Sequence, residues 1–188
     1  MRLHVQMPVC LLFSLAFLAA LAPHSLARAQ SFVPAPGQQF YVDLDTRDGA
    51  FSRWDHLDIS ALSAAIGELV VVRLGSHDKW LPTFTIRVES DAESAGLSIG
   101  GTRQPPLQLT RFHDRKGAPP ERSRLSGGVN LSEKLPLRMY WSTNSFSIQI
   151  GQGAVQRFTF SHPPKRLVIT AATGELEVHG LTLGRGTE

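Results

Sequence analysis

Apolar and polar residues alternate along most of the chain from residue 40 onward. A period of two places one set of side chains against a core and the other toward solvent, as in half-buried β-strands. Turn formers such as Asn144, Gly151 and Gly174 separate the alternating runs. Short strands with frequent turns are typical of antiparallel sandwiches and barrels, so the chain is predicted to be all-β. Only residues 60–69 could hold a helix, predicted as a single turn.

The first 29 residues have the pattern of a secretory leader. Arg2 precedes an apolar run over residues 9–22, and Ala27 and Ala29 are the small residues that a signal peptidase requires. The run is shorter than the roughly 20 apolar residues of a membrane-spanning helix. Cys10 has no small-residue box ahead of it, which argues against a lipoprotein. We therefore expect cleavage after residue 29 and an exported protein, periplasmic or extracellular, with one β-sandwich domain over residues 30–188.

Loss of this leader would change the charge and the cysteine content of the chain. The full sequence has 19 Lys+Arg and 16 Asp+Glu, and the leader contains Arg2, Arg28 and no acidic residue. The mature chain would carry 17 basic and 16 acidic residues, a net charge of +1. It would also lack cysteine, which excludes disulfides and thiol catalysis. A nucleic-acid partner and stable membrane insertion are not expected at this charge.

Residues 101–128 depart from the alternating pattern and are rich in proline, glycine and charge. We expect a long basic loop there, either a solvated flexible segment or a surface for an acidic polysaccharide, since long loops in compact domains are usually mobile or functional. Two acidic residues, Asp114 and Glu121, leave this segment with a net charge of +4. Its six basic residues are Arg103, Arg111, Arg115, Lys116, Arg122 and Arg124.

The order of alternating segments in the second half of the chain carries a resemblance. The segments are residues 137–141, 145–151, 166–169 and 174–181. This order is similar to the terminal half of the concanavalin A-like lectin/glucanase jelly rolls, which include laminin-G-like modules, and the resemblance extends over about residues 65–184. It implies two packed antiparallel sheets and a concave face or loop rim that meets a glycan. Fold alone does not establish function.

Aromatic residues outside the core are the first candidates for contact with sugar rings. Trp54 and Trp80 lie among polar residues, where each could stack on a ligand or close the open end of the sandwich. Tyr140 has the opposite parity from Leu137 and Met139 and is expected to face outward, whereas Trp141 is expected in the core. Together with three residues of the predicted basic loop, the candidate ligand-binding set is Trp54, Trp80, Tyr140, Arg111, His113 and Arg115.

Three acidic residues, Glu89, Asp91 and Glu93, match the Glu-x-Asp-x-Glu strand of the laminarinase-like glycoside hydrolases. The resemblance implies a nucleophile, an electrostatic helper and an acid/base in that order. Because Phe84, Ile86 and Val88 are expected to point inward, the alternation places all three carboxylates on the opposite strand face. The small residues at positions 90 and 92 depart from the bulky apolar residues of that family. The simpler interpretation is a charged strand end that runs into a turn, so no catalytic residue is assigned.

No cofactor is expected, and calcium is the alternative. Asp43, Asp45 and Asp48 partly match a calcium-binding loop, but their spacing is off by one residue. The histidines of residues 30–188 show no zinc spacing; they are His56, His77, His113, His162 and His179.

The function that the sequence favours is non-catalytic binding of an envelope or extracellular polysaccharide, with an acidic glycan as one option. One alternative is a glycoside hydrolase or polysaccharide lyase that uses Glu89, Asp91 and Glu93. Another is a structural or assembly partner in the cell envelope, whose open sheet edge pairs with a strand of another protein.

Overall fold

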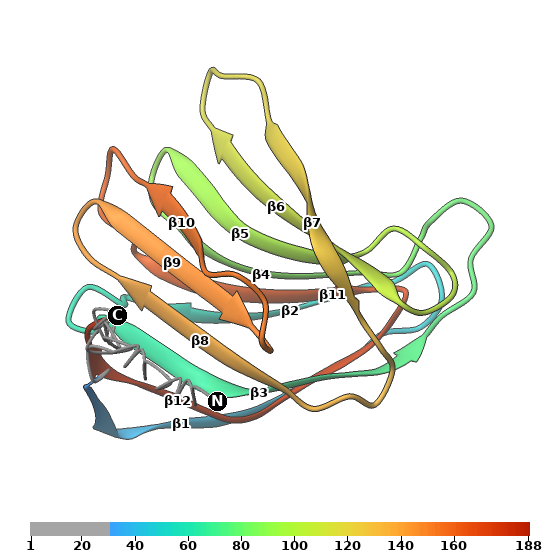
Figure 1. Cartoon of the computed structure of the whole chain (residues 1–188), viewed down its shortest axis with the longest axis horizontal. Helices are drawn as coiled ribbons and strands as arrows, with labels where there is room; N and C mark the ends of the chain where they lie inside the picture. The colour runs from blue at the N-terminus through green and yellow to red at the C-terminus, as the bar shows by residue number, and fades with distance from the viewer. Residues whose placement is uncertain (1–30) are drawn as a thin grey trace, which may run out of the picture.

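The computed structural model describes residues 31–188, and the predicted leader lies outside these residues. The chain folds into two six-stranded antiparallel sheets that face each other as a sandwich (Figure 1). In chain order the strands are β1 (Phe32–Asp45), β2 (Phe51–Leu57), β3 (Ala64–Leu74), β4 (Thr83–Glu89), β5 (Glu93–Gly100), β6 (Leu107–Arg115), β7 (Glu121–Val129), β8 (Leu135–Trp141), β9 (Ser145–Ile150), β10 (Gln156–Thr159), β11 (Arg166–Ala172) and β12 (Gly174–Gly186).

The strands are distributed between the sheets in an interleaved order. Sheet A has the order β1-β12-β3-β8-β9-β10, and sheet B has the order β2-β11-β4-β5-β6-β7. The first and last strands pair with each other, from Phe32 opposite Gly186 to Asp45 opposite Glu175. Sheet B is continuous in register from β2 to β6, so residues on these strands form straight rows across its face, such as Val168, Arg87, Gly96 and Phe112. The pairing of β6 with β7 is shifted between Gln108 and Thr110.

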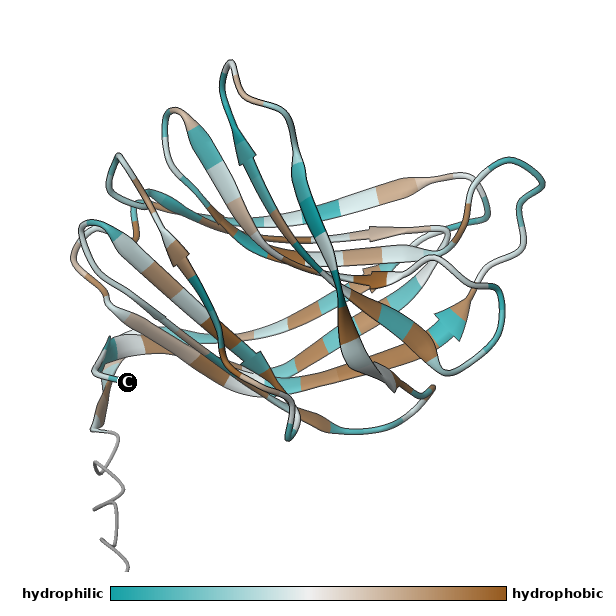
Figure 2. Ribbon diagram, turned by 45° about the horizontal axis from the view of Figure 1, so that its top comes forward, coloured by the Kyte–Doolittle hydropathy of each residue, from teal (hydrophilic) through white to brown (hydrophobic). Residues whose placement is uncertain are grey.

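The core fills the space between the inner faces of the two sheets. Apolar residues alternate with polar ones along the strands (Figure 2), which confirms the prediction of an all-β sandwich. Burial of each large aliphatic or aromatic side chain contributes roughly 1.5–3 kcal/mol. Sheet A supplies Leu137, Met139, Phe146, Ile148, Leu176, Val178, Leu181 and Leu183, and sheet B supplies Phe84, Ile86, Val88, Leu97, Ile99, Leu167 and Ile169, all at most 1% exposed.

One local prediction is met only in part and another is wrong. A short turn forms at Ser60 and Ala61, but the rest of residues 60–69 is extended and belongs mostly to β3. The segment 101–128 is not a long loop, because β6 and β7 form a hairpin that completes the edge of sheet B. Within residues 31–188, no helix is long and apolar enough to cross a membrane.

Candidate functional site

The outer face of sheet B carries mainly polar and small side chains, and Phe51 and Leu57 are exposed there at the two ends of β2. Val168, Thr170 and Phe112 are at most 6% exposed on this face because longer side chains flank them. The centre of the face is therefore recessed, and longer charged side chains project around it. The outward-facing residues toward the centre of the sheet are Arg53 and Asp55 on β2; Arg166, Val168 and Thr170 on β11; Thr85, Arg87 and Glu89 on β4; Ser94, Gly96 and Ser98 on β5; Thr110, Phe112 and Asp114 on β6; and Arg122 and Arg124 on β7.

A pocket of about 330 Å³ opens on this face. The small outward residues of β5 leave it empty between the longer side chains of β4 and β6. At Gly96 a Cβ atom would lie 2.1 Å from the carbonyl oxygen of Ile86 and 2.7 Å from Cα of Arg87, so only glycine fits there. The lining residues are Thr85, Arg87, Glu89, Ser94, Ser98, Phe112, Asp114 and Arg122.

Arginine–carboxylate pairs surround the pocket. The Arg87 guanidinium donates to Glu89 at 2.8 Å and to the Thr85 hydroxyl at 2.8 Å. Arg122 donates through two nitrogens to Asp114, at 2.5 and 2.9 Å, and its guanidinium carbon lies 5.2 Å from the centre of the Phe112 ring. These contacts hold a row of donors and acceptors in place beside an aromatic ring.

A third pair lies at the β2 side of the same face. Arg53 donates to both carboxylate oxygens of Asp55, at 2.7 and 2.8 Å, and contacts Glu89 at 3.5 Å. The hydrogen bond to Asp55 raises the pKa of the Arg53 guanidinium, with smaller contributions from the charges of Asp55 and Glu89. The carboxylates on this face therefore already accept hydrogen bonds from arginines.

The expectation that Glu89, Asp91 and Glu93 share one strand face is wrong. Strand β4 ends at Glu89 and β5 begins at Glu93, with a tight turn between them in which the Ser90 amide donates to the Glu93 carbonyl at 2.8 Å. Glu89 lies on the outer face of sheet B, whereas the exposed Asp91 pairs with Lys165 at 2.5 Å, which lowers its pKa. Glu93 points into the sandwich. A turn breaks the two-residue period, and this separates the three carboxylates.

Glu93 belongs instead to a buried polar cluster. Its carboxylate accepts hydrogen bonds from the amide and hydroxyl of Ser161 and from Nε2 of His113, at 2.9 Å for the histidine. Arg115 donates to Nδ1 of His113 at 3.0 Å, so Nε2 carries the proton that His113 donates to Glu93. Burial alone would raise the pKa of Glu93, but the hydrogen bonds from Ser161 and His113 lower it to about 2.

The three candidate residues expected in a basic loop lie on β6 and point toward the sandwich interior. His113 is 1% exposed between the rings of Phe158 and Phe160, so it is closed to a ligand at the surface. Arg111 lies over the Phe158 ring at 4.3 Å, and Arg115 contacts both Glu93 and Glu121. Of the three, His113 is therefore closed off, whereas Arg111 is partly exposed and Arg115 is exposed.

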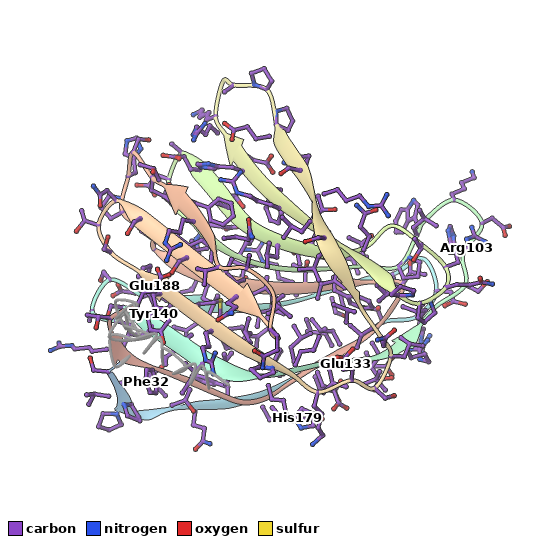
Figure 3. All side chains as sticks on the ribbon, in the orientation of Figure 1. Phe32, Arg103, Glu133, Tyr140, His179 and Glu188 are labelled. Atoms are coloured by element: carbon purple, nitrogen blue, oxygen red, sulfur yellow. The ribbon has the colours of Figure 1, made fainter. Side chains whose placement is uncertain are left out.

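The three candidate aromatic residues lie in different environments. Trp54 is half-buried against the core, with its ring 5.5 Å from Phe40, as expected for a residue that closes the sandwich edge. Trp80 is 50% exposed in the segment between β3 and β4. Tyr140 faces away from Met139, as predicted, but is only 9% exposed; Tyr140 and Glu188 lie close together in Figure 3 and line one pocket of about 400 Å³.

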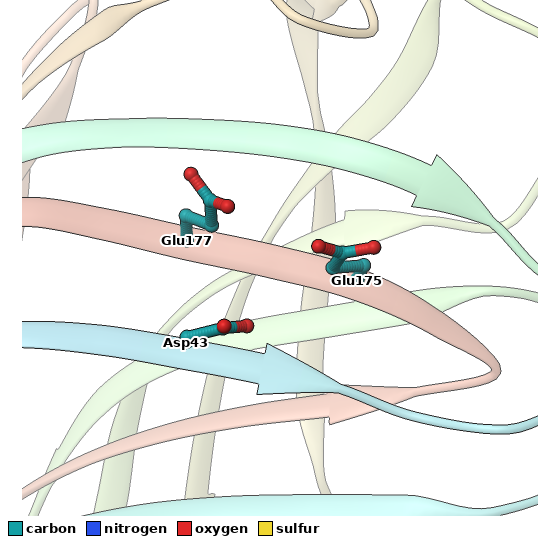
Figure 4. A group of neighbouring side chains, drawn as sticks. All are labelled: Asp43, Glu175 and Glu177. Carbon is teal, nitrogen blue, oxygen red and sulfur yellow. The ribbon is translucent and has the colours of Figure 1, made fainter.

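The three aspartates considered for calcium do not converge. Asp45 pairs with Arg73 at 2.5 Å, and Asp48 accepts a hydrogen bond from the Ser76 amide at 2.9 Å. Asp43 instead lies beside Glu175 and Glu177 on the outer face of sheet A, where oxygens of all three fall within 4.8 Å of one another (Figure 4). Sequence reasoning missed the two glutamates because strand pairing, not sequence proximity, brings them to Asp43.

No protein-family model matches this sequence, and no curated protein matches it. Solved structures resemble it in fold. Crh5 transglycosylase in complex with NAG superposes with a TM-score of 0.54 at 11% identity, over 82% of this chain and 78% of that chain. Apo Crh5 transglycosylase superposes with a TM-score of 0.52 at 11% identity, over 85% of each chain. The carbohydrate-binding module CBM66 from Bacillus subtilis superposes with a TM-score of 0.47 at 10% identity, over 82% of this chain and 94% of that chain.

Identities this low establish a shared fold and nothing about activity. The sheet order, the paired terminal strands and the similarity to the Crh5 structures agree with the resemblance seen in the sequence. The chain has the concanavalin A-like jelly-roll fold.

Proposed function

We propose that this protein is an exported, non-catalytic carbohydrate-binding protein whose ligand occupies the outer face of sheet B. The observation that carries the proposal is the pocket over β4–β7, where fixed arginine–carboxylate pairs surround the ring of Phe112 and a floor of small residues. Sugars present many hydroxyl groups. The fixed donors and acceptors around this pocket can pair with them, as in sites with few well-placed polar groups.

The fold supports a carbohydrate ligand by analogy. One protein with this fold, Crh5 transglycosylase, has been solved with NAG bound. The leader pattern in residues 1–29 supports export, because it would bring the chain to a periplasmic or extracellular space.

The hydrogen bonds that the carboxylates already make favour binding over cleavage. Glu89 and Asp114 face the pocket from strands two spacings apart, roughly 9.5 Å. Their oxygens already accept hydrogen bonds from Arg87 and Arg122, which leaves neither placed to donate a proton to a leaving group. Glu93 is enclosed in the core.

The test is a glycan array followed by titration calorimetry on the glycans retained. In Arg122→Met the affinity should fall about tenfold, because a charged hydrogen-bonding group is lost from the pocket rim. Arg138→Met, on the exposed outer face of sheet A, is the matched control and should bind as the unchanged protein does. Release of reducing ends from a bound glycan, abolished in Glu89→Gln, would overturn the non-catalytic assignment.

A further inference from the structure

The outer face of sheet B has an excess of positive charge in a chain that is close to neutral overall. Its outward strand positions hold five arginines and three acidic residues, a net charge of +2. The arginines are Arg53, Arg87, Arg122, Arg124 and Arg166, and the acidic residues are Asp55, Glu89 and Asp114.

The acidic residues do not neutralise the arginines evenly. Arg53, Arg87 and Arg122 are each paired with a carboxylate of this face. Within residues 31–188, Arg124 on β7 and Arg166 on β11 form no salt bridge, and both are exposed. Two guanidinium groups, one on each side of the pocket, therefore remain available to an anionic partner.

The opposite sheet has the opposite sign. On β1, β12 and β3 of sheet A, five carboxylates and one arginine face away from the core. Arg138 on β8 and Arg157 on β10 also face outward, which leaves the outer face of sheet A with a net charge of −2. The negative charge there contributes to a raised pKa of Tyr41, after desolvation and a hydrogen bond to Glu177. An anionic polymer is thus repelled from one broad face and attracted to the other. On β1, β12 and β3 the carboxylates are Asp43, Asp45, Glu68, Glu175 and Glu177, and the arginine is Arg73.

From this asymmetry we infer that the ligand is an acidic polysaccharide whose sugars carry carboxylates. Arginine presents two parallel N–H donors that fit a carboxylate, a geometry already made on this face by Arg122 and Asp114. Arg124 and Arg166 lie four strand spacings apart across sheet B and four residues apart along the strands, roughly 23 Å in all. A ligand that reaches both must be an extended oligosaccharide, so a single uronic acid is too short. This inference rests on the proposed function.

The experiment compares each acidic glycan with its neutral counterpart. Octasaccharides of galacturonate, mannuronate and glucuronate are titrated against the protein, together with the same chains after reduction of every carboxyl group to a primary alcohol. At least one acidic chain should bind about tenfold tighter than its reduced form, and the difference should shrink as salt screens the charges. The disaccharide of that same uronate should bind more weakly than the octasaccharide.

Two variants test the assigned arginines. Arg124→Gln and Arg166→Gln should each reduce the affinity for the acidic chain and leave the affinity for the neutral chain unchanged. Arg103→Gln, in the segment between β5 and β6, removes the same charge away from these strands and should change neither. Thermal unfolding of each variant confirms that it is folded.

Different results would overturn carbohydrate binding and the preference for an acidic ligand. If no carbohydrate binds at all, the proposed function itself is lost. If neutral and acidic chains bind equally, or if both arginine variants bind the acidic chain normally, only the acidic ligand is overturned. Equally tight binding of double-stranded DNA or anionic lipid vesicles would also overturn it, because attraction would then depend on charge without recognition of sugar.

Discussion

Glu93 illustrates how one buried carboxylate can be stable inside an apolar sandwich. An unpaired charge at this position would be strongly destabilising, but Ser161 and His113 supply three hydrogen bonds, and Arg115 stands at the rim at 3.5 Å. The cluster joins β5, β6 and the segment after β10, so it ties the two sheets together at one end. Removal of any one member leaves buried polar groups of the others without hydrogen-bond partners.

The lowered pKa of Glu93 makes the stability of the fold depend on pH. Because the pKa falls from 4.5 to about 2 on folding, the ionised group stabilises the protein above pH 4.5, and this contribution disappears as the pH falls toward 2. The shift corresponds to roughly 3 kcal/mol. Urea unfolding measured between pH 7 and pH 2 should show this loss.

The matched variants for that measurement are Glu93→Gln and Glu121→Gln. Glu93→Gln should be less stable at pH 7 and should lose less stability on acidification than the unchanged protein. Glu121 is exposed and contacts the same Arg115, so its substitution should leave the acid profile unchanged. Parallel profiles for all three proteins would show that Glu93 is not the responsible group.

At the scale of elements, the hairpin of β6 and β7 shows where sequence patterns succeed and fail. Strands such as β4 and β9 are predictable because one face of each is apolar throughout. In β6 the inward positions include Arg111 and His113, which hide the period of two, and the edge strand β7 is exposed along most of its length. The charged pocket was missed for a related reason: its residues come from four strands, and only the register between them reveals a common face.

Hydrogen exchange should separate these strands. The central strands β4 and β11 are paired on both sides and have buried inner faces, so their amides should exchange slowest. Strand β7 has one free edge and should exchange faster. Mass spectrometry of peptides that cover residues 83–89 and 121–129 makes the comparison. Equal protection of the two peptides would contradict the view of β7 as an open edge.

For the whole molecule, the two outer faces differ in the sites that they carry as well as in charge. The arginine-rich face of sheet B includes the pocket, whereas the acidic group of Asp43, Glu175 and Glu177 lies on sheet A, with the core between them. A cation held by that group would therefore sit away from a glycan bound on sheet B.

This separation predicts that glycan binding does not require calcium. Titration of the same glycan in excess EDTA and in added calcium chloride should give equal affinities, because no carboxylate of the acidic group lines the pocket. Asp43→Asn should likewise bind glycan normally. A large loss of affinity in EDTA, restored by calcium, would show that the ion acts on the binding face after all.

The pairing of β1 with β12 also sets how the molecule can be attached to something else. Phe32 lies opposite Gly186, so both ends of the described sandwich leave from the same corner of sheet A. The pocket belongs to the other sheet. A tether, tag or solid support joined at the carboxyl terminus would therefore leave the arginine-rich face of sheet B open to the surrounding solution, which makes that terminus the natural point for oriented immobilisation on a sensor surface.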